Sequence, residues 1–149
     1  PSFIVAIDTR EQKPYRFPRA EVKTLKSGDY SIVGLESKIA VERKSKADAF
    51  GTFGRGRARF IRELKRLRKF DYAAIVIESS LKDLLNPPPY TQMNPKSVIS
   101  SLLSWAVQYD VHVFFADDRL HANALVLKLL EKYWKHKGAV NASAQEDKS

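Results

Sequence analysis

One stretch, residues 28–48, constrains the fold of this chain more than any other. It reads GDYSIVGLESKIAVERKSKAD and contains two segments in which apolar and polar residues alternate, Asp29–Val33 and Ile39–Lys44. A short turn at residues 34–37 separates them, so the pattern predicts two antiparallel strands joined as a hairpin. A hairpin with one apolar face has to pack that face against a core, which favours a sheet-containing domain.

The register of this hairpin decides which side chains share a face. A symmetric turn places Asp29 opposite Glu42, and Lys44 follows on the same face. Two opposed carboxylates lie about 5 Å apart at Cβ, where like charges repel. A divalent cation with oxygen ligands would remove the repulsion, and this favours a metal-dependent phosphodiester-cleaving site. The alternatives are a solvated charged hairpin, or a one-residue slip that turns these groups to opposite faces.

At these residues the chain resembles the nuclease domain of the XPF-type structure-specific endonucleases. Three elements carry the resemblance, which are Asp8-Thr-Arg10-Glu11, Gly28-Asp29 and Glu42-Arg43-Lys44-Ser-Lys-Ala-Asp48. The resemblance implies an α/β fold with a restriction-endonuclease-like mixed central sheet flanked by helices. It also implies cleavage of branched or flapped DNA with Mg²⁺ or Mn²⁺ as cofactor.

The resemblance and the hairpin together suggest a role for each polar residue of the site. We expect metal ligands at Asp29 and Glu42, with Asp8 completing the shell directly or through water. Glu11 is expected nearby. Lys44 would orient or deprotonate the attacking water and offset charge on the phosphate. For Asp8, a simple end to a buried strand is the alternative.

Two residues of the ERK run have less direct roles. The predicted register turns Arg43 to the opposite face from Glu42, so we expect it to brace the strand in a buried ion pair, with DNA contact second. Asp48 either interacts favourably with the dipole of a short helix or pairs with Arg43 or Lys44.

Positive charge is concentrated beside the candidate site. Residues 41–70 contain eleven Lys or Arg and three Asp or Glu, which accounts for +8 of the chain's net charge of +9. Such clustering indicates a polyanionic partner, here DNA. The glycine-rich loop 51–57 lacks the GKT ending of a Walker loop, so it is either a phosphate-contacting loop or an ordinary linker. The expected DNA contacts are Arg10, Lys46, Arg55, Arg57, Arg59 and Arg62.

Periodicity and capping residues predict the elements around the hairpin. The expected strands are Phe3–Ile7, Val22–Lys26, Tyr72–Ile77 and Val111–Phe115. The expected helices are Lys46–Phe50 capped by Ser45, Ala58–Phe70, Ser80–Leu85, one that starts at Asn94-Pro95, and one that runs from Asp117 or Asp118 to about Lys135.

Length and composition limit the remaining possibilities. With 149 residues the chain forms one domain, and we expect a nuclease domain at 1–137 and a disordered tail at 138–149. The chain has no cysteine, which suits a reducing cytoplasm or nucleus, and we expect no signal peptide and no membrane span.

The assembly state and the activity each leave alternatives open. The last helix is apolar on more than one face, so it is either deeply buried or pairs with a second copy as a homodimer. A catalytically inactive DNA-binding or scaffold subunit, and a sequence-reading restriction-type nuclease, are the alternatives to a branch-cutting enzyme.

Overall fold

The computed structural model describes residues 2–89 and 91–138. Its strands are β1 (Val5–Asp8), β2 (Ala20–Lys23), β3 (Tyr30–Ile32), β4 (Ile39–Ser45), β5 (Tyr72–Glu78) and β6 (His112–Phe115). Its helices are α1 (Lys46–Gly51), α2 (Arg57–Leu67), α3 (Leu81–Leu84), α4 (Pro95–Tyr109) and α5 (Arg119–Tyr133), and α5 continues into the π-helical segment η1 (Trp134–Gly138).

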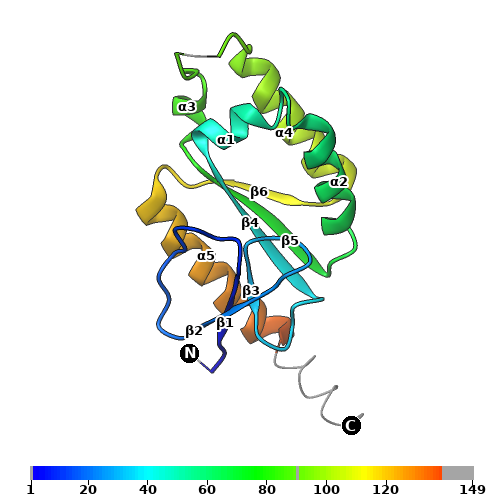
Figure 1. Ribbon diagram of the computed structural model, residues 1–149, viewed down its shortest axis with the longest axis vertical. Coiled ribbons are helices and arrows are strands. Elements are labelled where there is room, and N and C mark those ends of the chain that lie inside the picture. Colours follow the sequence, from blue (N-terminus) through cyan, green and yellow to red (C-terminus); the bar gives the residue numbers. More distant parts are fainter. Residues whose placement is uncertain (1, 90, 139–149) are drawn as a thin grey trace.

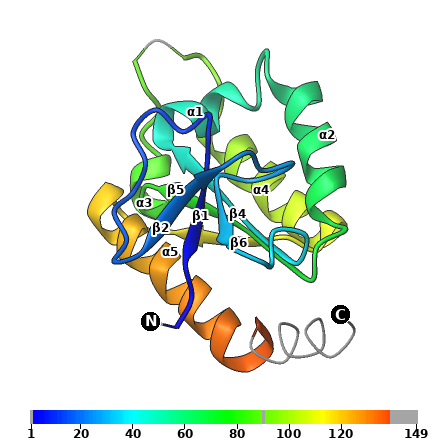
Figure 2. The ribbon, with the colours of Figure 1, turned by 60° about the horizontal axis from the view of Figure 1, so that its bottom comes forward.

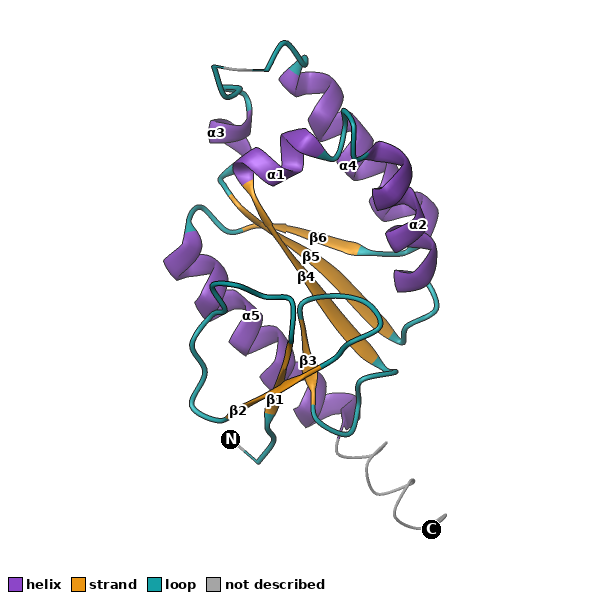
Figure 3. Cartoon of the chain, in the orientation of Figure 1, coloured by secondary structure: helices purple, strands orange, loops and turns teal. Residues whose placement is uncertain are grey.

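The six strands form one mixed sheet in the order β2-β1-β3-β4-β5-β6 (Figure 3). β3 pairs antiparallel with both of its neighbours, whereas β1 with β2, β4 with β5, and β5 with β6 are parallel pairs. The predicted α/β class with a mixed central sheet is confirmed.

Helices cover both faces of the sheet, and each face has its own hydrophobic core. Figures 1 and 2 show α1, α2 and α4 on one side of the sheet and α5 on the other. The first core joins Leu64 and Leu67 of α2 to Trp105 of α4, and the second joins Val126 and Leu130 of α5 to the other face of the sheet. The central strands are therefore buried on both faces.

The hairpin has the predicted register. Tyr30 pairs with Val41, the register that places Asp29, the residue just before β3, beside Glu42 of β4. The N–H of Asp29 donates to the Val41 carbonyl at 2.8 Å, which holds this residue against β4. The two faces are also as predicted, because Ile39 and Val41 belong to the α5-side core.

Three helix starts match their predicted caps. The side chains of Ser45, Asn94 and Asp118 each accept a hydrogen bond from the first turn of the helix that they precede. The second strand is an exception, since it starts at Ala20, two residues before the predicted Val22. β2 lies at the sheet edge and is defined by its pairing with β1.

The last helix is largely used by its own chain. Tyr133 is 5% exposed and its hydroxyl donates to Asp71 at 2.8 Å, while Trp134 is half-buried and its indole nitrogen donates to Ser2 at 3.1 Å. Leu120 remains 78% exposed. Of the predicted tail, Gly138 belongs to η1, and 139–149 lie outside the described residues. None of the described helices is long and apolar enough to span a membrane.

Candidate active site

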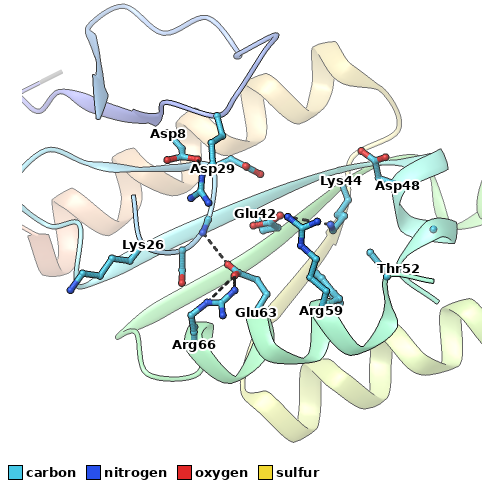
Figure 4. A pocket seen from close by; sticks show the side chains of 16 residues that line it. Asp8, Lys26, Asp29, Glu42, Lys44, Asp48, Thr52, Arg59, Glu63 and Arg66 are labelled. Atoms are coloured by element: carbon cyan, nitrogen blue, oxygen red, sulfur yellow. Dashed lines mark hydrogen bonds and ion pairs between the residues drawn. The ribbon is translucent and has the colours of Figure 1, made fainter. Parts of the chain in front are cut away.

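A pocket of about 480 Å³ lies between α2 and the ends of β1 and β4 (Figure 4). Five acidic and five basic side chains line it, which are Asp8, Asp29, Glu42, Asp48, Glu63, Arg10, Lys26, Lys44, Arg59 and Arg66. This mixture distinguishes the pocket from a purely cationic groove. The basic side chains can attract a phosphate, and the carboxylates can bind a metal ion, which basic side chains alone could not do.

Two of the acids that line the pocket, Asp29 and Glu42, lie in an environment that disfavours their ionised forms. Burial, together with nearby negative charge, raises the pKa of Asp29 from 3.8 to about 7. Burial and the adjacent Asp29 carboxylate raise the pKa of Glu42 from 4.5 to about 8. The N–H of Arg43 donates to an Asp29 oxygen at 2.7 Å and fixes that carboxylate beside β4. Two adjacent, half-buried carboxylates with raised pKa values are typical of a functional site.

Lys44 occupies the position predicted for it. Its Nζ lies 3.8 Å from a Glu42 oxygen and 4.7 Å from the centre of the Phe60 ring, so the ammonium is held between β4 and α2. Its side chain is 17% exposed. In this partly desolvated position the ammonium interacts more strongly with a nearby negative charge than it would on the open surface, because less water screens it.

Asp8 lies in the pocket wall, but both of its carboxylate oxygens are already occupied. One accepts from the Leu25 N–H at 2.9 Å, and the other accepts from Arg10 Nε at 2.8 Å. Arg10 in turn donates to the Leu25 carbonyl at 2.9 Å. Through these contacts Asp8 ties Leu25, at the start of the loop that contains Gly28, to β1.

The opposite face of β4 carries a paired charge network. Arg43 donates to Glu78 at 2.7 Å and lies 3.5 Å from Glu11, which also accepts from the Tyr30 hydroxyl. The Tyr15 hydroxyl donates to Glu78, and the Arg43 guanidinium covers the Tyr15 ring. Arg43 therefore forms the bracing ion pair that its register predicted. Glu11 belongs to this network and is absent from the pocket lining.

The predicted DNA contacts divide into three environments. Arg10 and Arg59 line the pocket, and Arg55 and Arg62 are exposed. Arg57 lies 5.3 Å above the Trp105 ring, and Lys46 pairs with Asp83 at 3.2 Å, so these two side chains also serve the fold.

Asp48 lines the pocket, and it forms no ion pair with Arg43 or Lys44 in the described parts of the chain.

Sequence reasoning missed three charged residues of the pocket, which are Lys26, Glu63 and Arg66. Glu63 lies 35 positions after Gly28, yet its carboxylate accepts from the Gly28 N–H at 3.2 Å. One signal could have revealed it, because Glu63 is the only acid in the eleven residues of α2. An acid on the inner face of an otherwise basic helix is seldom there for solubility alone.

The donor set of the pocket suits a hard divalent cation. Carboxylate oxygens of Asp29 and Glu42 are the ligands that Mg²⁺ and Mn²⁺ prefer, and burial, followed by neighbouring negative charge, raises the pKa values of both groups. Within residues 2–89 and 91–138, however, no group of three or more acidic or histidine side chains is arranged to hold a metal ion. The protein thus supplies a pair of ligands, which suits a cation that retains water.

Comparisons with known proteins agree with this geometry. None of the curated protein sequences matches significantly. XPF from Aeropyrum pernix has a similar fold, with a TM-score of 0.70 at 19% identity over 93% of this chain and 68% of that one. The same protein in complex with DNA gives a TM-score of 0.66 at 21% identity, over 89% of this chain and 65% of that one. The ERCC4 domain family model matches residues 7–129. The chain therefore belongs to the ERCC4 domain family, the XPF-type nuclease family that its GD and ERK motifs resemble.

Proposed function

We propose that this protein is a DNA endonuclease that hydrolyses phosphodiester bonds with Mg²⁺ or Mn²⁺. The opposed pair Asp29 and Glu42 carries the proposal, because both are half-buried in a pocket with Lys44 beside them and both have raised pKa values. A chain that only needed to fold would place a cation across from one of these acids. Family membership supports the same reaction class.

Each side chain has a distinct task in this reaction. Asp29 and Glu42 would hold the cation, which when bound would acidify a water and polarise a phosphate oxygen. The Lys44 ammonium is placed to orient the attacking water and to offset negative charge as the new P–O bond forms and the old one breaks. Arg59 and Lys26, at the rim of the same pocket, would hold flanking phosphates.

The proposed substrate is branched or flapped DNA. The support is family resemblance, the structural similarity to a protein known in complex with DNA, and the cationic helix α2 beside the pocket. Mg²⁺-dependent cleavage should be measured on flap, fork, four-way, duplex and single-stranded DNAs. Cutting confined to junctions is the expected result. Cutting at one base sequence in plain duplex would indicate a restriction-type enzyme, and binding without cutting would indicate a scaffold subunit.

We also propose that two copies associate through α5. Leu120 is 78% exposed, and Leu125, Leu127 and Leu129 are only half-buried. Covering these side chains would stabilise association by roughly 1.5–3 kcal/mol for each one fully buried, before the entropy of joining two chains is subtracted. Light scattering at micromolar concentration, with and without DNA, tests this. A mass of 17.0 kDa throughout would contradict it.

A further inference from the structure

Glu63 is conspicuous because the helix that carries it is otherwise cationic. α2 reads RARFIRELKRL, with five basic residues and this one acid. A carboxylate on a helix that faces DNA weakens binding, since it repels phosphates. The side chain is also only 16% exposed, so solubility does not explain it. Figure 4 shows Glu63 extending from α2 toward the loop that contains Gly28.

Both oxygens of Glu63 have defined partners. Oε1 accepts from the Gly28 N–H at 3.2 Å, and Oε2 accepts from the Arg66 guanidinium, including Nε at 3.1 Å. Arg66 neutralises the carboxylate, while the bond to Gly28 crosses from the helix to the sheet. The Glu63 side chain is therefore a strut between two parts of the site.

Gly28, which donates this hydrogen bond, has little freedom to move toward β4. Gly28 has a φ of +78°, and a Cβ at this position would lie 3.2 Å from Ala40 Cβ and from the Val41 backbone. Its neighbour Asp29 is bound to β4 through Val41 and Arg43. The glycine is thus held against β4 on one side, and Glu63 holds its N–H from the other.

We infer that Glu63 is a positioning residue that fixes the Gly28 loop, and through it the Asp29 carboxylate, relative to α2. This inference rests on the proposed nuclease function and deepens it. The helix that presents Arg59 to the pocket is connected by this hydrogen bond to the loop that presents Asp29. Glu63 acts through the loop and leaves the cation to Asp29 and Glu42. Groups that orient metal ligands in this way commonly contribute about 10–100-fold to metal affinity or activity.

Three substitutions separate reach from charge. Glu63→Gln keeps an oxygen that accepts from Gly28 but loses the charge, whereas Glu63→Asp keeps the charge and loses the reach. Glu63→Ala loses both. A positioning role predicts that Glu63→Gln resembles wild type and that Glu63→Asp and Glu63→Ala are both impaired. A direct metal ligand would give the reverse order for Gln and Asp.

The hairpin turn offers a matched control. Glu36 also accepts from the N–H of a glycine with positive φ, Gly34, at 2.9 Å, and also pairs with a cation, Lys23. Glu36, Gly34 and Lys23 are all absent from the pocket lining. Glu36→Ala should therefore reproduce any general effect of removing such a carboxylate and leave the site unchanged.

Two measurements that need no cleavage come first. Hydrogen exchange by NMR should show the Gly28 amide exchanging roughly two- to tenfold faster in Glu63→Ala and Glu63→Asp, the factor expected for one hydrogen bond, and unchanged in Glu63→Gln. Glu36→Ala should affect Gly34 instead. Calorimetric titration with Mn²⁺ should give about tenfold weaker binding for Glu63→Ala and Glu63→Asp only.

Cleavage kinetics, measured on a DNA that the wild-type protein cuts, complete the test. At saturating Mn²⁺, kcat should fall about tenfold in Glu63→Asp while KM for DNA changes little, because the positions of the phosphate contacts are retained. The inference is overturned if Glu63→Gln weakens Mn²⁺ binding as much as Glu63→Ala, or if no variant changes Gly28 exchange. Should wild type cut no DNA, the proposed function fails, while the exchange and Mn²⁺ results still decide the role of Glu63.

Discussion

The two faces of strand β4 treat charge in opposite ways. On the α5 side, Arg43 and Glu78 form a close ion pair at 2.7 Å, with Glu11 and Tyr15 as further partners. On the α2 side, Glu42 faces a second acid, and its nearest cation is 3.8 Å away. Residues 42 and 43 are neighbours in the sequence, so only the alternation of the strand separates the two environments.

This difference shows which face serves stability and which serves chemistry. A paired network holds β4 in place, because both of its carboxylates, Glu78 and Glu11, have the Arg43 guanidinium as a partner. Two adjacent, half-buried acids with only one distant cation between them destabilise the fold unless a ligand compensates for their repulsion, and such local costs are concentrated at functional sites. The destabilising repulsion between the acids of the site thus lies on the α2 side of β4, and the ion-pair network that stabilises the strand lies on the α5 side.

The largest expected effect is on cleavage, and it comes from the α2 side. Glu42→Gln should lower Mg²⁺-dependent cleavage by more than about 100-fold, the upper end of the range for outer-shell partners, because a ligand itself is lost. DNA binding should stay nearly intact, and the melting temperature in EDTA should not fall, since the repulsion from Asp29 is relieved. A marked drop in that temperature would show that Glu42 is structural.

The α5 side should respond in the opposite way. Arg43→Ala should lower the free energy of unfolding by about 3 kcal/mol, the lower end of the range for a buried pair, because it leaves the half-buried Glu78 and Glu11 without their cation. Urea denaturation measures this. Lys46→Ala breaks a more exposed pair with Asp83 and serves as the control, with an expected loss below about 1 kcal/mol. Equal losses would remove the distinction between the two faces.

A smaller effect concerns pH. The pKa values of Asp29 and Glu42 are raised on folding, from 3.8 to about 7 and from 4.5 to about 8. Their contribution is therefore fully present below about pH 4 and is lost as the pH rises through 7 to 8. In EDTA, wild type should lose at least about 1.4 kcal/mol more than Glu42→Gln between pH 5 and pH 8, and Mg²⁺ should restore part of it. Parallel pH curves for the two proteins would contradict the assigned shifts.

The smallest effect separates the two sides of the sheet in DNA binding. Arg59→Gln, at the pocket, should weaken binding to all DNAs alike and reduce the slope of log K against log salt by about 0.9, as expected for one phosphate contact. Lys132→Gln, on α5, should leave the slope unchanged. Fluorescence anisotropy across a salt series measures both. A loss of affinity for one DNA structure only would make Arg59 a specificity residue.

Local features of the chain could be predicted from the sequence. The register that opposes Asp29 and Glu42 follows from two-residue periodicity and a symmetric turn, and the caps Ser45, Asn94 and Asp118 follow from residue type beside a periodic segment. The same alternation places the Arg43 side chain on the opposite face of β4 from Glu42. These features depend on interactions within a few residues, so a pattern in the sequence is enough to specify them.

Contacts between distant segments were decided only by the tertiary structure. No local pattern indicates that Glu78 accepts from Arg43, that the Leu25 N–H donates to Asp8, or that Glu63 accepts from Gly28. Each of these depends on how a helix or a parallel strand packs back on the sheet after a long connection. The sequence by itself thus determined which residues carry the chemistry on β3 and β4, whereas packing of the two helix layers decided which charges are paired and which remain available for a ligand.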